Sequence, residues 1–101
     1  MSYTIKISPL ARLDIVESTA WYEKRRTGLG NEFYQEVSNM IDSLADSPRI
    51  FQIQYADVRR ALTKKFSFGV FYIIEEEAKR VFVVAVLHTS RNPQIWKDRV
   101  N

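Results

Sequence analysis

The chain has 101 residues and contains no cysteine and only one histidine. Without cysteine there can be no disulfide, no thiolate metal site and no cysteine nucleophile, which fits a reducing compartment. The sequence also lacks an apolar run long enough to span a membrane, and its first residues lack the apolar core of a signal peptide. We therefore expect a cytoplasmic protein that has no membrane partner.

Motifs that bind metals or cofactors are missing as well. The sequence shows no cluster of metal ligands, no glycine-rich phosphate loop and no nucleophile elbow. We predict no metal and no cofactor, and most enzyme classes are excluded. The length predicts a single domain over residues 1–101, which is enough chain to bury roughly two-thirds of its unfolded surface.

Charge is unevenly distributed along the chain. Residues 1–54 hold 6 basic and 7 acidic side chains, a net charge of −1, whereas residues 55–101 hold 9 and 5, a net charge of +4. This asymmetry predicts one positively charged face of a sheet, suited to nucleic acid or to an acidic protein. The alternative is a solvated surface with a modest basic bias.

The N-terminal segment predicts a strand followed by a helix. Apolar and polar residues alternate over Tyr3–Ser8, which is typical of a half-buried strand. Ser8 is a favourable N-cap and Pro9 is tolerated at the first helical position. Apolar residues then recur at helical spacing as far as Tyr22, and we expect the glycines at 28 and 30 to end this helix.

A second helix is predicted next. Asn31 can cap it, Phe33, Val37 and Leu44 lie on its apolar stripe, and the Asp46–Pro48 segment ends it. Because the connection between the two helices is short, we expect them to form an antiparallel hairpin.

The C-terminal half predicts a sheet and a short terminal helix. The segments Val58–Thr63, Phe66–Ile74 and Val81–Leu87 are typical of strands, and the last is apolar enough to be buried on both faces. Ile50–Ala56 has no clear period. Asn92–Pro93 can begin a last helix. The predicted class is α+β: an N-terminal strand, a helical hairpin, a three-strand antiparallel meander and a short C-terminal helix.

Three stretches, spanning nearly the whole chain, resemble the RelE/ParE superfamily, the toxin halves of bacterial type II toxin–antitoxin pairs. They are Pro9–Ile15 running on to Trp21 and Tyr22; Val58–Leu62 followed by Phe66–Ile73; and Val83–His88 followed by Arg91–Pro93 and Trp96. The resemblance implies a cognate antitoxin partner that folds on binding. It also implies one of two targets, since ParE-like members poison DNA gyrase and RelE-like members cut mRNA on the ribosome.

The residues favour the ParE-like branch. Gly69 occupies the position where RelE places an arginine, and Trp96 lies near the position of a late catalytic tyrosine. The ending Leu87–His88 followed by Arg91–Pro93 is more similar to ParE-like toxins. The first hypothesis is therefore a non-enzymatic inhibitor of DNA gyrase. The alternative is a ribosome-dependent mRNA endoribonuclease, and a third is an interaction domain without toxicity.

The predicted target-binding residues are mostly basic and lie in the C-terminal half: Arg59, Arg60, Lys64, Lys65, His88, Arg91 and Trp96. In the endoribonuclease alternative His88 and Arg91 are the catalytic candidates, because an imidazole ordinarily titrates near neutral pH and a guanidinium can hold a phosphate. His88 is equally well interpreted as a structural histidine.

Each of the other candidates also has a structural interpretation. Arg59 and Arg60 are adjacent in a strand, so their side chains point to opposite faces and only one of them can face a shared groove. Either arginine can instead pair with a helix carboxylate. Trp96 is predicted to anchor the C-terminal tail by packing, with a base-stacking platform as the alternative.

Overall fold

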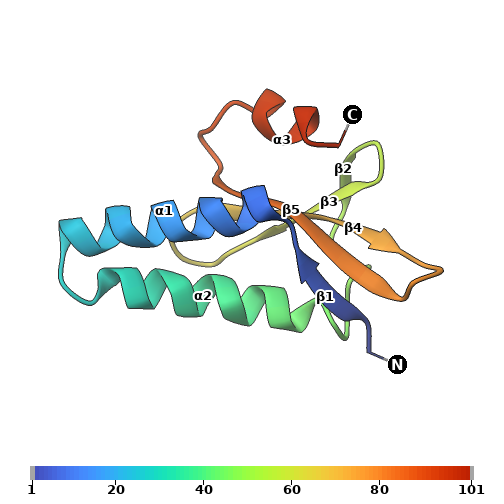
Figure 1. Ribbon diagram of the computed structural model, residues 1–101, viewed down its shortest axis with the longest axis horizontal. Coiled ribbons are helices and arrows are strands. Elements are labelled where there is room, and N and C mark those ends of the chain that lie inside the picture. Colours follow the sequence, from blue (N-terminus) through green and yellow to red (C-terminus); the bar gives the residue numbers. More distant parts are fainter. Residues whose placement is uncertain (1, 101) are drawn as a thin grey trace.

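The computed structural model describes residues 2–100 and has the predicted α+β architecture (Figure 1). In chain order its elements are β1 (Thr4–Ile7), α1 (Pro9–Arg25), α2 (Leu29–Ser43), β2 (Ile53–Tyr55), β3 (Val58–Leu62), β4 (Phe68–Glu75), β5 (Arg80–His88) and α3 (Gln94–Asp98). None of the helices in this part of the chain is long and apolar enough to cross a membrane.

The sheet has five strands in the order β1-β5-β4-β3-β2. The predicted antiparallel meander is present as β3, β4 and β5. Two features were not predicted. β1 lies parallel to β5, and β2 adds an edge strand in the stretch that had no clear sequence period. That strand has only three residues and all are exposed or half-buried, so no apolar alternation marks it in the sequence.

The first helix begins as predicted. Ser8 has an extended backbone and its Oγ accepts a hydrogen bond from the Ala11 N–H at 3.1 Å, while Pro9 occupies the first helical position. The helix ends at Arg25, and the Arg26 N–H donates to the Tyr22 carbonyl at 3.2 Å. Lys24 and Arg25 in the last turn face the negative end of the helix dipole.

The predicted start of the second helix is wrong. Gly28, in a left-handed conformation with φ 90°, is the N-cap, so Asn31 lies inside the helix. The Glu23 carboxylate accepts hydrogen bonds from the N–H groups of Gly28 and Gly30 and satisfies the helix start from α1. Gly30 does not end the first helix. A Cβ there would lie 2.7 Å from the Thr19 carbonyl oxygen, so glycine permits the close approach of the two helices.

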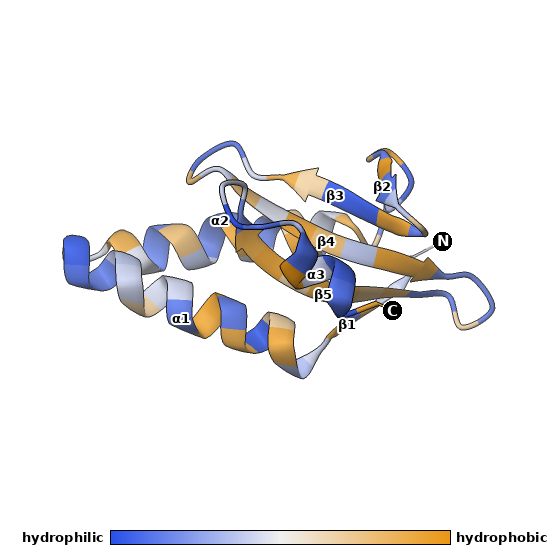
Figure 2. Ribbon diagram, turned by 90° about the horizontal axis from the view of Figure 1, so that it is seen from above, coloured by the Kyte–Doolittle hydropathy of each residue, from blue (hydrophilic) through white to orange (hydrophobic). Residues whose placement is uncertain are grey.

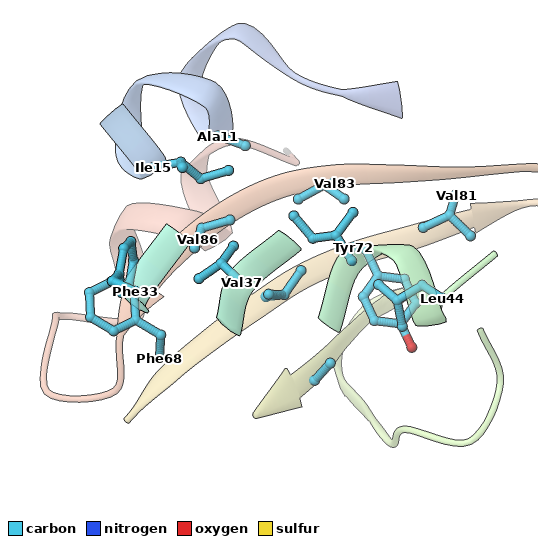
Figure 3. Packing of buried hydrophobic residues seen from close by; sticks show 13 residues of the cluster. Ala11, Ile15, Phe33, Val37, Leu44, Phe68, Tyr72, Val81, Val83 and Val86 are labelled. Carbon is cyan, nitrogen blue, oxygen red and sulfur yellow. The ribbon is translucent and has the colours of Figure 1, made fainter. Parts of the chain in front are cut away.

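The helical hairpin covers one face of the sheet (Figures 1 and 3). Ile15 of α1 and Phe33 and Val37 of α2 pack against a sheet surface that includes Val83 and Tyr72. The core on this face comprises Ala11, Ile15, Phe33, Val37, Ile41, Leu44, Ala61, Phe68, Val70, Tyr72, Val81, Val83 and Val86.

Tyr72 carries a hydroxyl into this core. Its side chain is fully buried, and its hydroxyl donates a hydrogen bond to the Pro48 carbonyl at 2.6 Å. Burial raises the pKa of Tyr72 to about 12, although the Arg59 charge acts in the opposite direction. The phenol is therefore held in its neutral form, which is the form that can donate to the carbonyl.

The short helix α3 covers part of the opposite face of the sheet (Figure 2). Trp96 stacks on Phe71 at a centroid distance of 4.6 Å, in a second apolar cluster with Val58, Ala85 and Leu87. β4 and β5 are thus buried on both faces, which confirms the prediction made from the apolar run in β5.

β4 begins later than predicted. Phe66 and Ser67 have φ values of 71° and 51°, in the left-handed region, so they belong to the turn after β3. The Thr63 hydroxyl accepts from the Phe68 N–H at 3.1 Å and helps to close this turn. The pairing of β4 with β5 therefore begins at Phe68 rather than at Phe66.

Candidate functional site

A hollow of about 210 Å³ lies where β3, the end of β5 and α3 meet. We call it the cationic hollow, and it is lined by Gln54, Arg60, Phe71, Leu87, His88, Thr89, Arg91, Pro93, Trp96 and Lys97. Three of these side chains are basic, one is an imidazole, and among the described residues no carboxylate lines the space. Of the predicted basic residues, Arg60 and Arg91 line this hollow.

Arg60 enters the hollow from β3. It pairs directly with Phe71 of β4 and shares that face of the sheet. Its side chain is only half-buried, and within residues 2–100 it has no hydrogen-bond or ion-pair partner. A guanidinium held in a hollow without a carboxylate is open to an anionic ligand.

Arg59 points to the other face, as the alternation of a strand requires. Its Nη1 donates to the carbonyls of Phe51 at 2.7 Å and Arg49 at 3.2 Å, so it secures the segment before β2. These carbonyls, rather than a helix carboxylate, are its partners. Arg59 does not line the cationic hollow.

His88 ends β5 and lies at the border of the hollow. Its Nδ1 accepts a hydrogen bond from the Ser90 N–H at 3.0 Å and lies 2.8 Å from the Ser90 hydroxyl oxygen. With Nδ1 serving as an acceptor, the proton of the neutral ring is on Nε2. The ring also contacts Phe68 edge-on, with centroids 5.5 Å apart. These contacts with Ser90 and Phe68 fix the His88 ring in place, which fits a structural role, and the ring also borders the hollow.

Arg91 and Lys97 supply the other charges of the hollow. Arg91 is exposed in the turn after β5, where its N–H donates to the His88 carbonyl at 3.0 Å. Lys97 belongs to α3, and its ammonium lies 5.0 Å from the centroid of the Tyr55 ring and 5.9 Å from that of Trp96. Lys97 is not among the predicted target-binding residues. Its position directly after the predicted anchor Trp96 was the available signal.

Trp96 forms the apolar wall of the hollow. Its side chain is 7% exposed, its plane lies 21° from that of Phe71, and Tyr55 contacts it edge-on. The prediction that Trp96 anchors the tail is confirmed. One face of the ring stacks on Phe71, and the side chain is buried in the apolar cluster on this side of the sheet, which favours the packing role over base stacking.

The predicted lysines lie elsewhere. Lys64 and Lys65 are in the turn between β3 and β4, and their backbone N–H groups donate to one oxygen of Glu36 at 2.9 and 3.0 Å. Both side chains are exposed, and neither lines the hollow. The structure therefore brings Arg60, His88, Arg91 and Trp96 together. It separates these residues from Arg59, Lys64 and Lys65.

A second, larger groove of about 500 Å³ lies between α1 and the end of β5. Trp21, which is 52% exposed, lies on its wall under the Arg25 guanidinium at 4.5 Å from the ring centroid. Asp14 also lines it and is paired with Arg99 at 2.6 Å. This ion pair joins α1 to the segment after α3.

The fold and the sequence together define the class of this protein. Residues 5–93 match the family described as the ParE toxin of the type II toxin–antitoxin system parDE, and the chain belongs to this family. It is thus a toxin of the ParE/RelE type from a type II toxin–antitoxin system. A comparison with curated proteins gives no significant match.

Solved structures of low sequence identity share the fold. The chromosomal ParDE system from P. aeruginosa matches with a TM-score of 0.76 at 11% identity, covering 86% of this chain and 96% of that one. The intact E. coli RelBE toxin–antitoxin complex matches with a TM-score of 0.66 at 17% identity, with coverages of 89% and 100%. The isolated E. coli RelE toxin matches with a TM-score of 0.64 at 16% identity, with coverages of 98% and 96%.

Proposed function

We propose that this toxin inhibits DNA gyrase and that a cognate antitoxin neutralises it. The family match over residues 5–93 is the observation that carries the proposal, because it is to the ParE toxins. The cationic hollow supplies a directed surface for an anionic target, with Arg60 and Arg91 as its guanidinium contacts.

The chemistry of the hollow supports binding over cleavage. In-line RNA cleavage needs a base for the 2′-hydroxyl, an acid for the leaving oxygen and cations for the developing charge. Arg60, Arg91 and Lys97 can supply the cations, and His88 can act as one acid or base. Besides His88, no imidazole, carboxylate or phenol lines the hollow within the described part of the chain.

The outer surface of α1 suits the antitoxin. Leu10, Leu13, Val16 and Trp21 are between 49% and 61% exposed on this one helix, so apolar side chains lie on its outer side as well as on its buried side. A partner segment that folds on binding can cover such a surface with an apolar stripe of its own. The P. aeruginosa and E. coli relatives are themselves described as toxin–antitoxin systems.

Co-expression tests the antitoxin part of the proposal. Expressed alone, the chain should arrest growth, and co-expression with a small protein encoded beside it should restore growth and give a stable complex. A harmless chain that binds no neighbouring gene product would contradict the toxin–antitoxin function.

Supercoiling tests the target. Purified wild-type protein should inhibit gyrase supercoiling and leave translated mRNA intact. Arg60→Glu and Arg91→Glu should each weaken inhibition, because charge reversal removes the guanidinium hydrogen bonds and replaces electrostatic attraction to the target by repulsion. Lys6→Glu is the matched control, since it makes the same charge change on an exposed residue of β1 outside the hollow. Equal losses for the three variants would mean that only net charge matters.

One observation favours a second function, the ribosome-dependent mRNA endoribonuclease. Three cations and an imidazole surround a space with no acidic lining in the described residues, and such a space can hold a scissile phosphate. For this function His88→Gln should reduce cleavage by roughly 10²-fold or more while the protein stays folded. Codon-specific cuts in the ribosomal A site with unaffected supercoiling would replace our first proposal by this one.

A further inference from the structure

Gly69 of β4 lies beneath the side chain of Arg60. A Cβ at position 69 would be 3.1 Å from Arg60 Cγ and 3.0 Å from Cε1 of the Phe71 ring. Carbon atoms in normal van der Waals contact lie about 3.5–4.0 Å apart. A larger residue at position 69 would therefore force Arg60 or Phe71 to move. Gly69 is also opposite Leu62 in the β3–β4 register, and it carries no side chain on the face of the sheet where Arg60 and Phe71 lie.

The movement would fall mainly on Arg60. The Phe71 ring is 4% exposed and is held by its stacking on Trp96, whereas Arg60 is half-buried and has no polar partner in the described chain. A buried ring between packed neighbours resists displacement more than a partly exposed side chain does. The packing of Arg60 Cγ over Gly69 thus sets the direction in which this side chain leaves β3.

We propose that Gly69 is a positioning residue, whose missing side chain lets Arg60 cross β4 and present its guanidinium in the cationic hollow to a phosphate group. This inference rests on the proposed target-binding role of the hollow. A phosphate fits the hollow better than a carboxylate. A free phosphate or phosphate monoester carries more charge than a carboxylate and at least one more acceptor oxygen, and a nucleic-acid backbone offers several charged phosphates in a row. Both suit a site with three separate cations. Two N–H groups of one guanidinium can hold it at a fixed angle.

The test is an NMR titration of the full chain with inorganic pyrophosphate as the probe. Wild-type protein should bind it, and Arg60→Ala should weaken binding roughly tenfold, as expected for a hydrogen bond between charged groups. Gly69→Ala should weaken it severalfold, but should change it less than twofold in the Arg60→Ala background. Leu62→Ala, which alters the residue opposite Gly69, should leave binding within twofold of wild type.

A purely structural role for Gly69 predicts a different result. If Gly69→Ala weakens binding equally with and without Arg60, it disturbs the whole hollow and the proposal is wrong. A second measurement on wild-type protein stands even if Gly69→Ala does not fold. The γ-methylene protons of Arg60 should show nuclear Overhauser contacts to the Gly69 α-protons, and their absence would also overturn the proposal.

The same titration separates this inference from the proposed function. Gyrase inhibition without pyrophosphate binding would contradict the inference alone. Pyrophosphate binding that depends on Gly69 and Arg60, without gyrase inhibition, would contradict the function alone. A single-stranded oligonucleotide identifies the source of the phosphate. Tighter binding than pyrophosphate points to a nucleic-acid backbone, and equal or weaker binding points to a free phosphate compound.

Discussion

The ion pair between Asp14 and Arg99 should be a main support of the C-terminal segment. Arg99 Nη1 donates to Asp14 Oδ2 at 2.6 Å and to the Val84 carbonyl at 3.1 Å, and Nη2 donates to Asp14 Oδ1 at 3.1 Å. The side chains are only 15% and 9% exposed. Arg99→Met keeps the apolar stem and removes all three hydrogen bonds.

The cost follows from what Arg99→Met leaves behind. The Asp14 carboxylate would stay buried with one remaining donor, the Val86 N–H at 3.0 Å. Removing one partner of a buried pair typically costs about 3–5 kcal/mol, and the partial exposure here places the expected loss at about 3 kcal/mol. For a domain of this size that loss corresponds to a fall in melting temperature of about 12–24 °C.

Thermal and guanidinium unfolding, followed by circular dichroism, would measure this loss. Arg91→Met is the matched control, because Arg91 is exposed and lacks an ion-pair partner among residues 2–100. The double variant Asp14→Asn with Arg99→Met should recover part of the loss, because asparagine still accepts from Val86 without an uncompensated charge. If Arg99→Met costs no more than Arg91→Met, the pair does not stabilise the fold and the expected loss is refuted.

Two further predictions concern buried rings. Trp96→Ala should cost about 3 kcal/mol by removing the ring stacked on Phe71, so an unchanged melting temperature would show that α3 is not anchored there. Burial raises the pKa of Tyr72 to about 12 in the folded protein, whereas the pKa in the unfolded chain is about 10. The unfolded state therefore loses this proton first, and the free energy of unfolding should fall as the pH rises from 10 to 12. In the Tyr72→Phe variant, denaturation curves should show a fall in the free energy of unfolding over this pH range that is smaller by roughly 2–3 kcal/mol. Identical pH profiles for the variant and the wild type would contradict this prediction.

The local elements and the class of fold can be predicted from patterns along the chain. Ser8 and Pro9 mark the start of α1 because capping depends on neighbouring residues only. The apolar run of β5 predicted a strand buried on both faces because burial leaves its pattern in the strand itself. Family membership also follows from the chain, since its residues match the ParE model over most of their length.

How these elements meet depends on contacts between residues far apart in the chain. The parallel pairing of β1 with β5 joins residues more than seventy positions apart, and no local pattern encodes such a pair. The start of α2 depends on Glu23 reaching from α1 to the N–H groups of Gly28 and Gly30. From the sequence alone, Asn31 was the better cap.

The candidate site divides in the same way. Sequence patterns identified the basic residues, and strand alternation predicted that Arg59 and Arg60 face opposite sides. Which of them shares a hollow with Arg91 depends on the β3–β4 register and on where Trp96 anchors α3. In the sequence, Gly69 is notable only because RelE has an arginine at this position. In the folded sheet its missing side chain leaves room for Arg60. This neighbour cannot be read from the sequence, because strand register is set by contacts between distant residues.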